Sequence, residues 1–243
     1  AVAGSSSSFS SSGGRVNSSI KFLYVDVLVE ITEISESNLL NSVFVFWEAS
    51  AISFDFFSTA IFYSKTEDEY LENLKYRVYV CLCALDAVRH IIARNVEKGF
   101  LPNFSYGLID FEHLYNTIGF IGIYETMKKF GYVKLDEFGN TFYTEKASEF
   151  GKKIFDTMRN TADAFIAENK CDYKINTEQI PAESAAAKLM NKDKFFYPKA
   201  KIYDLPLYGN QFMPLGIKTT GQERIRVQAL FDGYCNGGSI LHF

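Results

Sequence analysis

Residues 173–198 read YKINTEQIPAESAAAKLMNKDKFFYP and combine a strand, a proline and the start of a helix. Positions 173–180 alternate loosely with a period of two, which is typical of a strand. Pro181 ends strand pairing because proline has no N–H to donate, and it suits the first position of a helix. The alanine-rich run that follows has a high helix propensity. We therefore predict a strand at 173–179 and a helix that begins at Pro181.

The start of this helix predicts an anion-binding site. The unpaired backbone N–H groups near Ala182, Glu183 and Ser184 point out of the helix N-terminus at the end of a strand, where phosphate is the usual ligand. Glu183 places a carboxylate in this site, beside the hydroxyl of Ser184. Two explanations for Glu183 remain open. It complements the helix dipole as a first-turn acid, or it polarises a hydroxyl or relays a proton during a reaction.

Composition limits the class of protein. A chain of 243 residues, 47% of them hydrophobic, is long enough to bury a large core as one domain or two. The net charge of −4 argues against a nucleic-acid surface dominated by phosphate contacts. Long apolar runs and a signal peptide are both absent from the sequence, so we expect no membrane contact. The four cysteines show no metal-binding spacing, so we predict no metal site in the chain and a reducing, cytoplasmic location.

The sequence divides into a leader and one domain. Residues 1–19 contain nine serines and read as a low-complexity leader. We expect residues 20–243 to form an α/β domain, because strand-like and helix-like stretches alternate along them. Apolar, strand-like stretches occupy 20–31, 43–47 and 52–63.

Helix signals are strongest in the middle of the chain. Thr66-Glu67-Asp68-Glu69 is a capping box that predicts a helix to about residue 98. A second helix is expected at about 110–130, with Asn116 and Gly119 on one face. Its interior glycines indicate the close approach of another backbone or of a ligand. A third helix is expected at about 145–169.

Four stretches carry a resemblance to a known family. They are FEHLYNTIGFIGIYE at 111–125, INTEQIPAESAAAKLMNKDKFFYP at 175–198, YGNQFMPLGIKTT at 208–220 and CNGGSILHF at 235–243. In this order they resemble the anaerobic (class III) ribonucleoside-triphosphate reductases, which are glycyl-radical enzymes. The resemblance covers about 63–243, and the first 62 residues do not match the expected pattern.

The resemblance implies a fold, an activity and site residues. The fold would be part of the ten-stranded α/β barrel of ribonucleotide reductases and glycyl-radical enzymes. The activity would be anaerobic reduction of ribonucleoside triphosphates to deoxyribonucleoside triphosphates by glycyl and thiyl radicals. Glu183 would be catalytic. The expected substrate-binding residues are Pro181, Ala182, Ser184, Asn116, Asn210, Gly237, Gly238 and Ser239. The amide of Asn210 either contacts base or ribose or satisfies the backbone of its own turn.

The resemblance also implies cofactors and partners that these residues do not supply. The glycyl-radical motif and a cysteine-rich zinc module are not in this chain, and the reductant would be formate or a thiol. Expected partners are dNTP or ATP effectors, a radical-SAM activating enzyme and a second copy in a homodimer. We therefore expect the middle part of a larger enzyme. The alternatives are another glycyl-radical enzyme and a non-catalytic nucleotide-binding paralogue.

Overall fold

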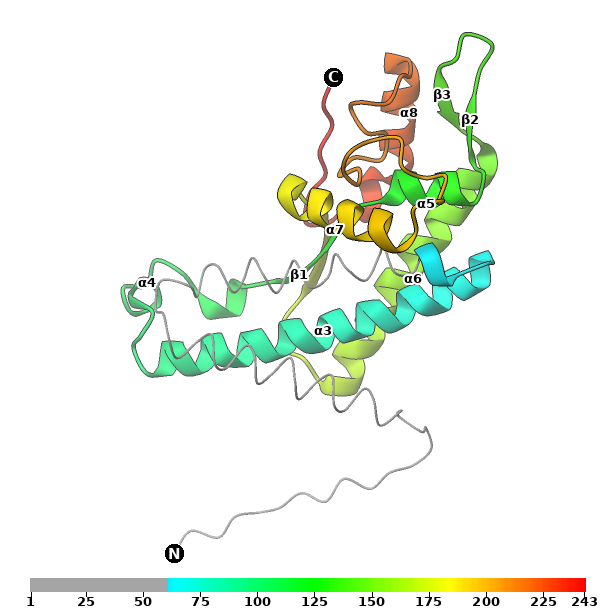
Figure 1. Cartoon of the computed structure of the whole chain (residues 1–243). Coiled ribbons are helices and arrows are strands. Elements are labelled where there is room, and N and C mark those ends of the chain that lie inside the picture. The colour runs from blue at the N-terminus through cyan, green and yellow to red at the C-terminus, as the bar shows by residue number, and fades with distance from the viewer. Residues whose placement is uncertain (1–60) are drawn as a thin grey trace, which may run out of the picture.

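Two long helices underlie the fold. The computed structural model describes residues 61–243, and within them α3 (Glu67–Glu97) packs against α6 (Glu145–Asn169) (Figure 1). The hydroxyl of Thr66 accepts the N–H of Glu69 at 3.2 Å, and the Glu69 carboxylate accepts the N–H of Thr66 at 3.4 Å. Both halves of the capping box are therefore formed, and the predicted helices at 66–98 and 145–169 are confirmed.

A parallel pair of strands lies at the centre. β1 (Asn116–Phe120) pairs in parallel with β4 (Ile175–Gln179), so that Phe120 lies opposite Gln179. The segment near Gly238 continues the sheet on the other edge of β4. It forms a parallel bridge with Glu178, and the N–H of Gln179 donates to the carbonyl of Gly238 at 3.1 Å.

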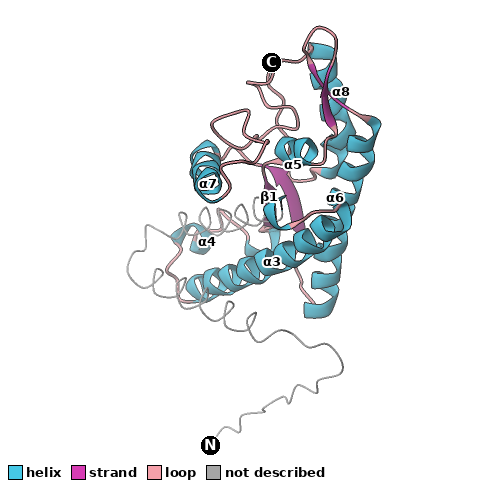
Figure 2. Ribbon diagram, turned by 45° about the vertical axis from the view of Figure 1, so that its right-hand side comes forward, coloured by secondary structure: helices cyan, strands magenta, loops and turns pink. Residues whose placement is uncertain are grey.

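Helices cover the strands on two sides. In both views β1 runs between α7 (Glu183–Phe196) and the pair of α3 and α6 (Figure 2). The two parallel strands are separated along the chain by helices, as in an α/β fold. The remaining elements are α4 (Pro102–Ser105), η2 (Phe111–His113), α5 (Ile123–Lys129), the antiparallel hairpin of β2 (Val133–Leu135) and β3 (Thr141–Tyr143), α8 (Gly221–Phe231) and η3 (Asp232–Tyr234).

Aromatic rings form the core beneath the strands. Phe120 of β1 packs edge-on to Phe155 of α6, with ring centroids 5.3 Å apart. Phe212 lies 5.1 Å from Phe231 of α8, and all four rings are at most 2% exposed. Burial of such rings gives a large hydrophobic stabilisation, and their edge contacts fix the relative positions of the elements. The cluster therefore fixes the 208–220 segment against β1 and α8.

The prediction of one helix over 110–130 is wrong. The structure has η2, then β1, then the short helix α5 in its place. β1 is buried on nearly its whole length, so it shows no alternation of polar and apolar residues, and periodicity cannot separate a short buried strand from a helix. Gly122 marks the boundary, because its φ of 83° lies in the left-handed region that glycine adopts without strain.

Two further predictions need correction. α7 begins at Glu183 rather than at Pro181, because Ala182 has the non-helical φ of −122° and ψ of 41° of a helix-capping residue. Residues 61–63, at the end of the strand expected at 52–63, are helical. Dense branched and aromatic residues suit a buried helix as well as a buried strand. The leader at 1–19 and the strands expected at 20–31 and 43–47 lie outside the described residues.

Candidate functional site

The site lies where β1 and β4 end. β1 leads through Gly122 into α5, and β4 leads through Pro181 into α7. Residues 208–211, which we call the 208–211 loop, cross between these two helix starts. The N–H of Gly122 donates to the carbonyl of Gly209 at 2.8 Å. Crevices at the carboxyl ends of parallel strands are the usual place for ligands in α/β folds.

The start of α7 brings four predicted residues together. Ala182 is buried, while Pro181, Glu183 and Ser184 are exposed. In the described part of the chain no side chain caps this helix, so its first N–H groups remain available to an anion. The side-chain amide of Asn210 donates to Oε1 of Glu183 at 3.0 Å. Asn210 therefore holds the Glu183 carboxylate at the helix start.

The predicted glycines lie beside β4. The N–H of Gly237 donates to the carbonyl of Thr177 at 3.0 Å. A Cβ added at Gly237 would lie 3.1 Å from both Cβ and Oε2 of Glu178, so a larger residue would require Glu178 to shift. Gly238 has a φ of 145°, which also favours glycine. The hydroxyl of Ser239 donates to the exposed Asp232, next to α8, at the surface of the protein.

Asn116 stands apart from the other predicted residues. It is the first residue of β1, so it lies at the opposite end of that strand from Gly122 and α7; the four residues of extended chain from Asn116 to Phe120 alone span about 13 Å. Its side-chain N–H groups are buried without a partner among residues 61–243. It lines a cavity of about 10 Å³, together with Arg89 and Phe111. That volume fits one water molecule and not a nucleotide.

Two buried glutamines were not among the predicted site residues. Oε1 of Gln179, the last residue of β4, accepts the N–H of Ile240 at 2.7 Å. Oε1 of Gln211 accepts the N–H of His242 at 3.1 Å. Together they fix the 237–242 segment beside the 208–211 loop. Amide side chains at a strand end and beside Asn210 were the only sequence signal for this arrangement.

Buried acids also escaped the sequence analysis. Glu125 is 1% exposed in the first turn of α5, and its Oε1 accepts the N–H of Gly209 at 3.0 Å. Burial raises the pKa of Glu125 to about 7. Tyr208 donates its hydroxyl to Oδ2 of the buried Asp193 at 2.5 Å. A carboxylate within the apolar run FIGIYETM was a signal for Glu125, because acids are seldom buried without a role.

The comparisons with known proteins agree with this geometry. The model of the family described as anaerobic ribonucleoside-triphosphate reductase matches residues 52–243. The chain belongs to the anaerobic ribonucleoside-triphosphate reductase family. This confirms the resemblance carried by the four sequence stretches. None of the curated proteins compared with the chain matches it.

Solved structures of anaerobic ribonucleotide reductases are similar to this reductase chain. The Thermotoga maritima enzyme in complex with dATP and CTP is 34% identical with a TM-score of 0.64, over 71% of this chain and 28% of that chain. The same enzyme with citrate in the active site is 34% identical with a TM-score of 0.67, over 73% of this chain and 31% of that chain. Another anaerobic ribonucleotide reductase is 32% identical with a TM-score of 0.69, over 80% of this chain and 29% of that chain. The chain thus spans less than a third of these proteins.

The described part of this reductase chain does not fit a metal centre. Between residues 61 and 243 no group of three or more histidines, cysteines and acids lies close enough to hold an ion. Burial raises the pKa of the Cys235 thiol to about 12 and that of Cys83 to about 11, so both are protonated at neutral pH. None of the described helices has the length and apolar content of a bilayer span.

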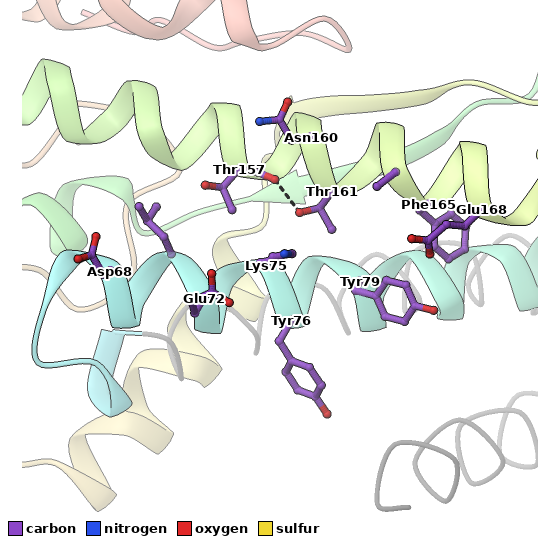
Figure 3. A pocket seen from close by; sticks show the side chains of 12 residues that line it. Asp68, Glu72, Lys75, Tyr76, Tyr79, Thr157, Asn160, Thr161, Phe165 and Glu168 are labelled. Atoms are coloured by element: carbon purple, nitrogen blue, oxygen red, sulfur yellow. Dashed lines mark hydrogen bonds between the residues drawn. The ribbon is translucent and has the colours of Figure 1, made fainter. Parts of the chain in front are cut away.

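A groove of about 790 Å³ lies between α3 and α6 and contains none of the predicted site residues. Figure 3 shows acidic side chains at both ends of it, Asp68 and Glu72 from α3 and Glu168 from α6. Its α6 wall includes Thr161, whose hydroxyl donates to the carbonyl of Thr157 at 2.7 Å. Nothing in the described residues shows what covers this groove.

Proposed function

We propose that the protein carrying this chain reduces ribonucleoside triphosphates to deoxyribonucleoside triphosphates anaerobically, and that the start of α7 binds the substrate phosphates. The observation that carries the proposal is the uncapped N-terminus of α7 at the end of β4, with Asn210 holding Glu183 beside it. Backbone N–H groups at a helix start bind phosphate without a charged side chain. Family membership and the nucleotide complexes of similar structures support the choice of substrate.

Each residue at the helix start has a distinct task in this proposal. Pro181 ends β4, and the buried side chain of Ala182 fixes the backbone of the helix start, whose N–H groups bind the phosphate. The hydroxyl of Ser184 adds a donor. Glu183 polarises a ribose hydroxyl or relays a proton, since Asn210 fixes one of its oxygens and leaves the other available.

Residues farther from α7 complete the site. Gly237 and Gly238 let the chain run close to β4, and Ser239 anchors that segment through Asp232. We keep Asn116 as a supporting residue at the base of β1, because its side chain lies too far from α7 to touch the same phosphate. Asn210 contacts the sugar or base with the part of its amide that Glu183 does not use.

We assign the remaining parts of the reaction to protein outside these residues. They comprise the rest of a ten-stranded α/β barrel, the glycyl-radical motif and a zinc module. Formate or a thiol is the proposed reductant, and a radical-SAM enzyme the proposed activator. We further propose that the whole protein is a cytoplasmic homodimer and that dNTP or ATP effectors regulate it. When formed, the glycyl radical supplies the radical chemistry, while this chain binds and orients the nucleotide in a site closed to water.

Substitutions at α7 test the proposal. Glu183→Gln should lower kcat more than it raises KM for CTP, because the amide keeps the bond to Asn210 but cannot relay a proton. Ala182→Val should weaken CTP binding by about tenfold or more, which corresponds to roughly 1.4 kcal/mol, because the added methyl groups overfill the core beneath Ala182 and displace the backbone N–H groups of the helix start. Glu137→Gln, at an exposed turn, is the control.

Two results would contradict these roles. Unchanged kcat in Glu183→Gln reduces Glu183 to helix electrostatics. An unchanged dissociation constant in Ala182→Val removes the phosphate assignment. Circular dichroism checks that the variants fold as the wild type does.

A further inference from the structure

Glu125 joins the end of β1 to the 208–211 loop. Its Oε1 accepts the N–H of Gly209 at 3.0 Å. The N–H of Gly122 donates to the carbonyl of Gly209 at 2.8 Å. Both backbone groups of Gly209 are thus bonded to the turn between β1 and α5. The position of this glycine therefore depends on Glu125.

The loop passes this constraint on to α7. Asn210 follows Gly209 directly and donates to Glu183 at 3.0 Å. Tyr208 precedes Gly209 and donates to Asp193 in the body of α7. Three consecutive loop residues are therefore bonded to α5 and α7, and Glu125 is the side chain that fixes the middle one.

The surroundings of Glu125 suit a neutral acid. Its second oxygen, Oε2, is buried and meets no hydrogen-bond donor within the described residues. An ionised carboxylate buried with one oxygen unpaired is costly, whereas a neutral carboxyl carries its proton on that oxygen. Burial accordingly raises the pKa of Glu125 to about 7, although its own backbone N–H and the N–H of Gly209 oppose the shift.

Among the charged neighbours of Glu125, Lys128 favours its ionised form, but less than Asp204 disfavours it. Lys128, on the same helix, is already paired with Asp204. Tyr124 donates its hydroxyl to that same Asp204 at 2.9 Å. Tyr143 of β3 donates to the carbonyl of Phe212, and Tyr208 to Asp193, so neither phenol donates to Glu125. The negative charges near Glu125, chiefly Asp204, disfavour its ionisation further.

We propose that Glu125 is a positioning residue which, as a neutral acid, closes the 208–211 loop and holds Asn210 against Glu183. Ionisation of Glu125 releases the loop, because the carboxylate then gains more from water than from the closed arrangement. The consequence for nucleotide binding rests on the proposed function of α7. The closing of the loop itself does not.

The size of the effect follows from linkage. The carboxyl titrates near its ordinary pKa of 4.5 when the loop is open and near 7 when it is closed. Because the closed-state pKa is raised, closure is favoured fully below pH 4.5 and loses that advantage as pH rises to 7. The ratio of open to closed loop should rise about tenfold per pH unit between roughly pH 5 and 6.5, and level off above 7 after about 300-fold in total.

Amide hydrogen exchange measures this opening. In the protein, the protection of residues 207–213, corrected for the intrinsic pH dependence of exchange, should fall over this window. Glu125→Gln should show no such fall, since the amide keeps an acceptor for Gly209 but cannot ionise. Glu137→Gln should behave as the wild type. A flat wild-type profile overturns the proposal without reference to any variant, and so does an equal slope in a folded Glu125→Gln variant.

CTP binding separates this inference from the proposed function. Glu125→Ala, which leaves the Gly209 N–H unpaired, should weaken CTP binding at pH 6 by about tenfold, and Glu125→Gln should restore it. Equal CTP affinity in the alanine variant contradicts the positioning role. If the wild type shows the exchange profile but binds no CTP, the proposed function fails and loop closure stands. If CTP binds while exchange is flat, loop closure fails and the proposed function stands.

Discussion

Replacing Gly151 by alanine tests how tightly α6 packs against α8. Gly151 is buried in α6, and a Cβ built on it would lie 2.5 Å from Cζ of Phe231 and 3.3 Å from Cε of Met127. Real Cβ atoms do not approach other atoms as closely as 2.5 Å. The variant therefore requires the Phe231 ring to move.

Two opposing effects set the magnitude. Alanine in a helix interior is more favourable than glycine by about 1 kcal/mol. Overpacking a filled core costs about 1–3 kcal/mol. The ring of Phe231 is 1% exposed and has neighbours at centroid distances of 5.1 Å (Phe212) and 5.7 Å (Phe155), so it has no open space to enter. The overpacking cost should thus lie in the upper half of its range, and we expect a net loss of about 1–2 kcal/mol.

Urea unfolding followed by far-UV circular dichroism measures this loss. The variant Phe231→Leu provides the matched background, because leucine removes the ring atoms that meet the new methyl group. In that background Gly151→Ala should become neutral or stabilising, which gives a favourable coupling in the double-mutant cycle. A Gly151→Ala variant as stable as the wild type would refute the reasoning, and so would an equal loss in both backgrounds.

The remaining predictions concern a helix cap and a close backbone approach. Thr66→Ala should lower the free energy of unfolding by about 1 kcal/mol, measured in urea, because it leaves the N–H of Glu69 without its cap; no change would show that water replaces the hydroxyl at no cost. Gly237→Val should speed amide exchange in residues 236–242, because its side chain meets Glu178 at 3.1 Å, whereas Gly221→Ala, with open space around it, should not. Unaltered exchange in the valine variant would mean that the segment adjusts without leaving β4.

The sequence was sufficient for elements with strong local signals. The capping box at Thr66 and the long apolar spacing after it predict α3 correctly, because both depend on neighbours three or four residues away. β1 was predicted as a helix because its burial comes from β4 and α3, which lie elsewhere in the sequence. Pro181 was placed inside α7, although the helix starts two residues later.

The same distinction between contacts that are near and far in the sequence applies to the candidate site. The start of α7 and the paired glycines were expected from short motifs, since each depends on residues adjacent in sequence. The bond between Asn210 and Glu183 joins residues 27 positions apart, and that between Glu125 and Gly209 joins residues 84 apart. No local pattern encodes such pairs. The wrong prediction for β1 also accounts for the placement of Asn116. A helix face was expected to bring Asn116 close to the site, whereas the strand carries it far from α7.

The pairing of β1 with β4 has a consequence for how the chain folds. Its register joins Asn116 to Ile175, roughly sixty residues later, across a crossover that contains α5, the hairpin and α6. Contacts between distant residues must overcome the entropy of closing a long loop before they contribute, and this slows folding. α3 and α6 can form within their own segments, while the edge of β1 stays unpaired until Ile175 arrives. Exposed strand edges favour association between chains, so we expect β1 to be a site of aggregation while the described residues fold.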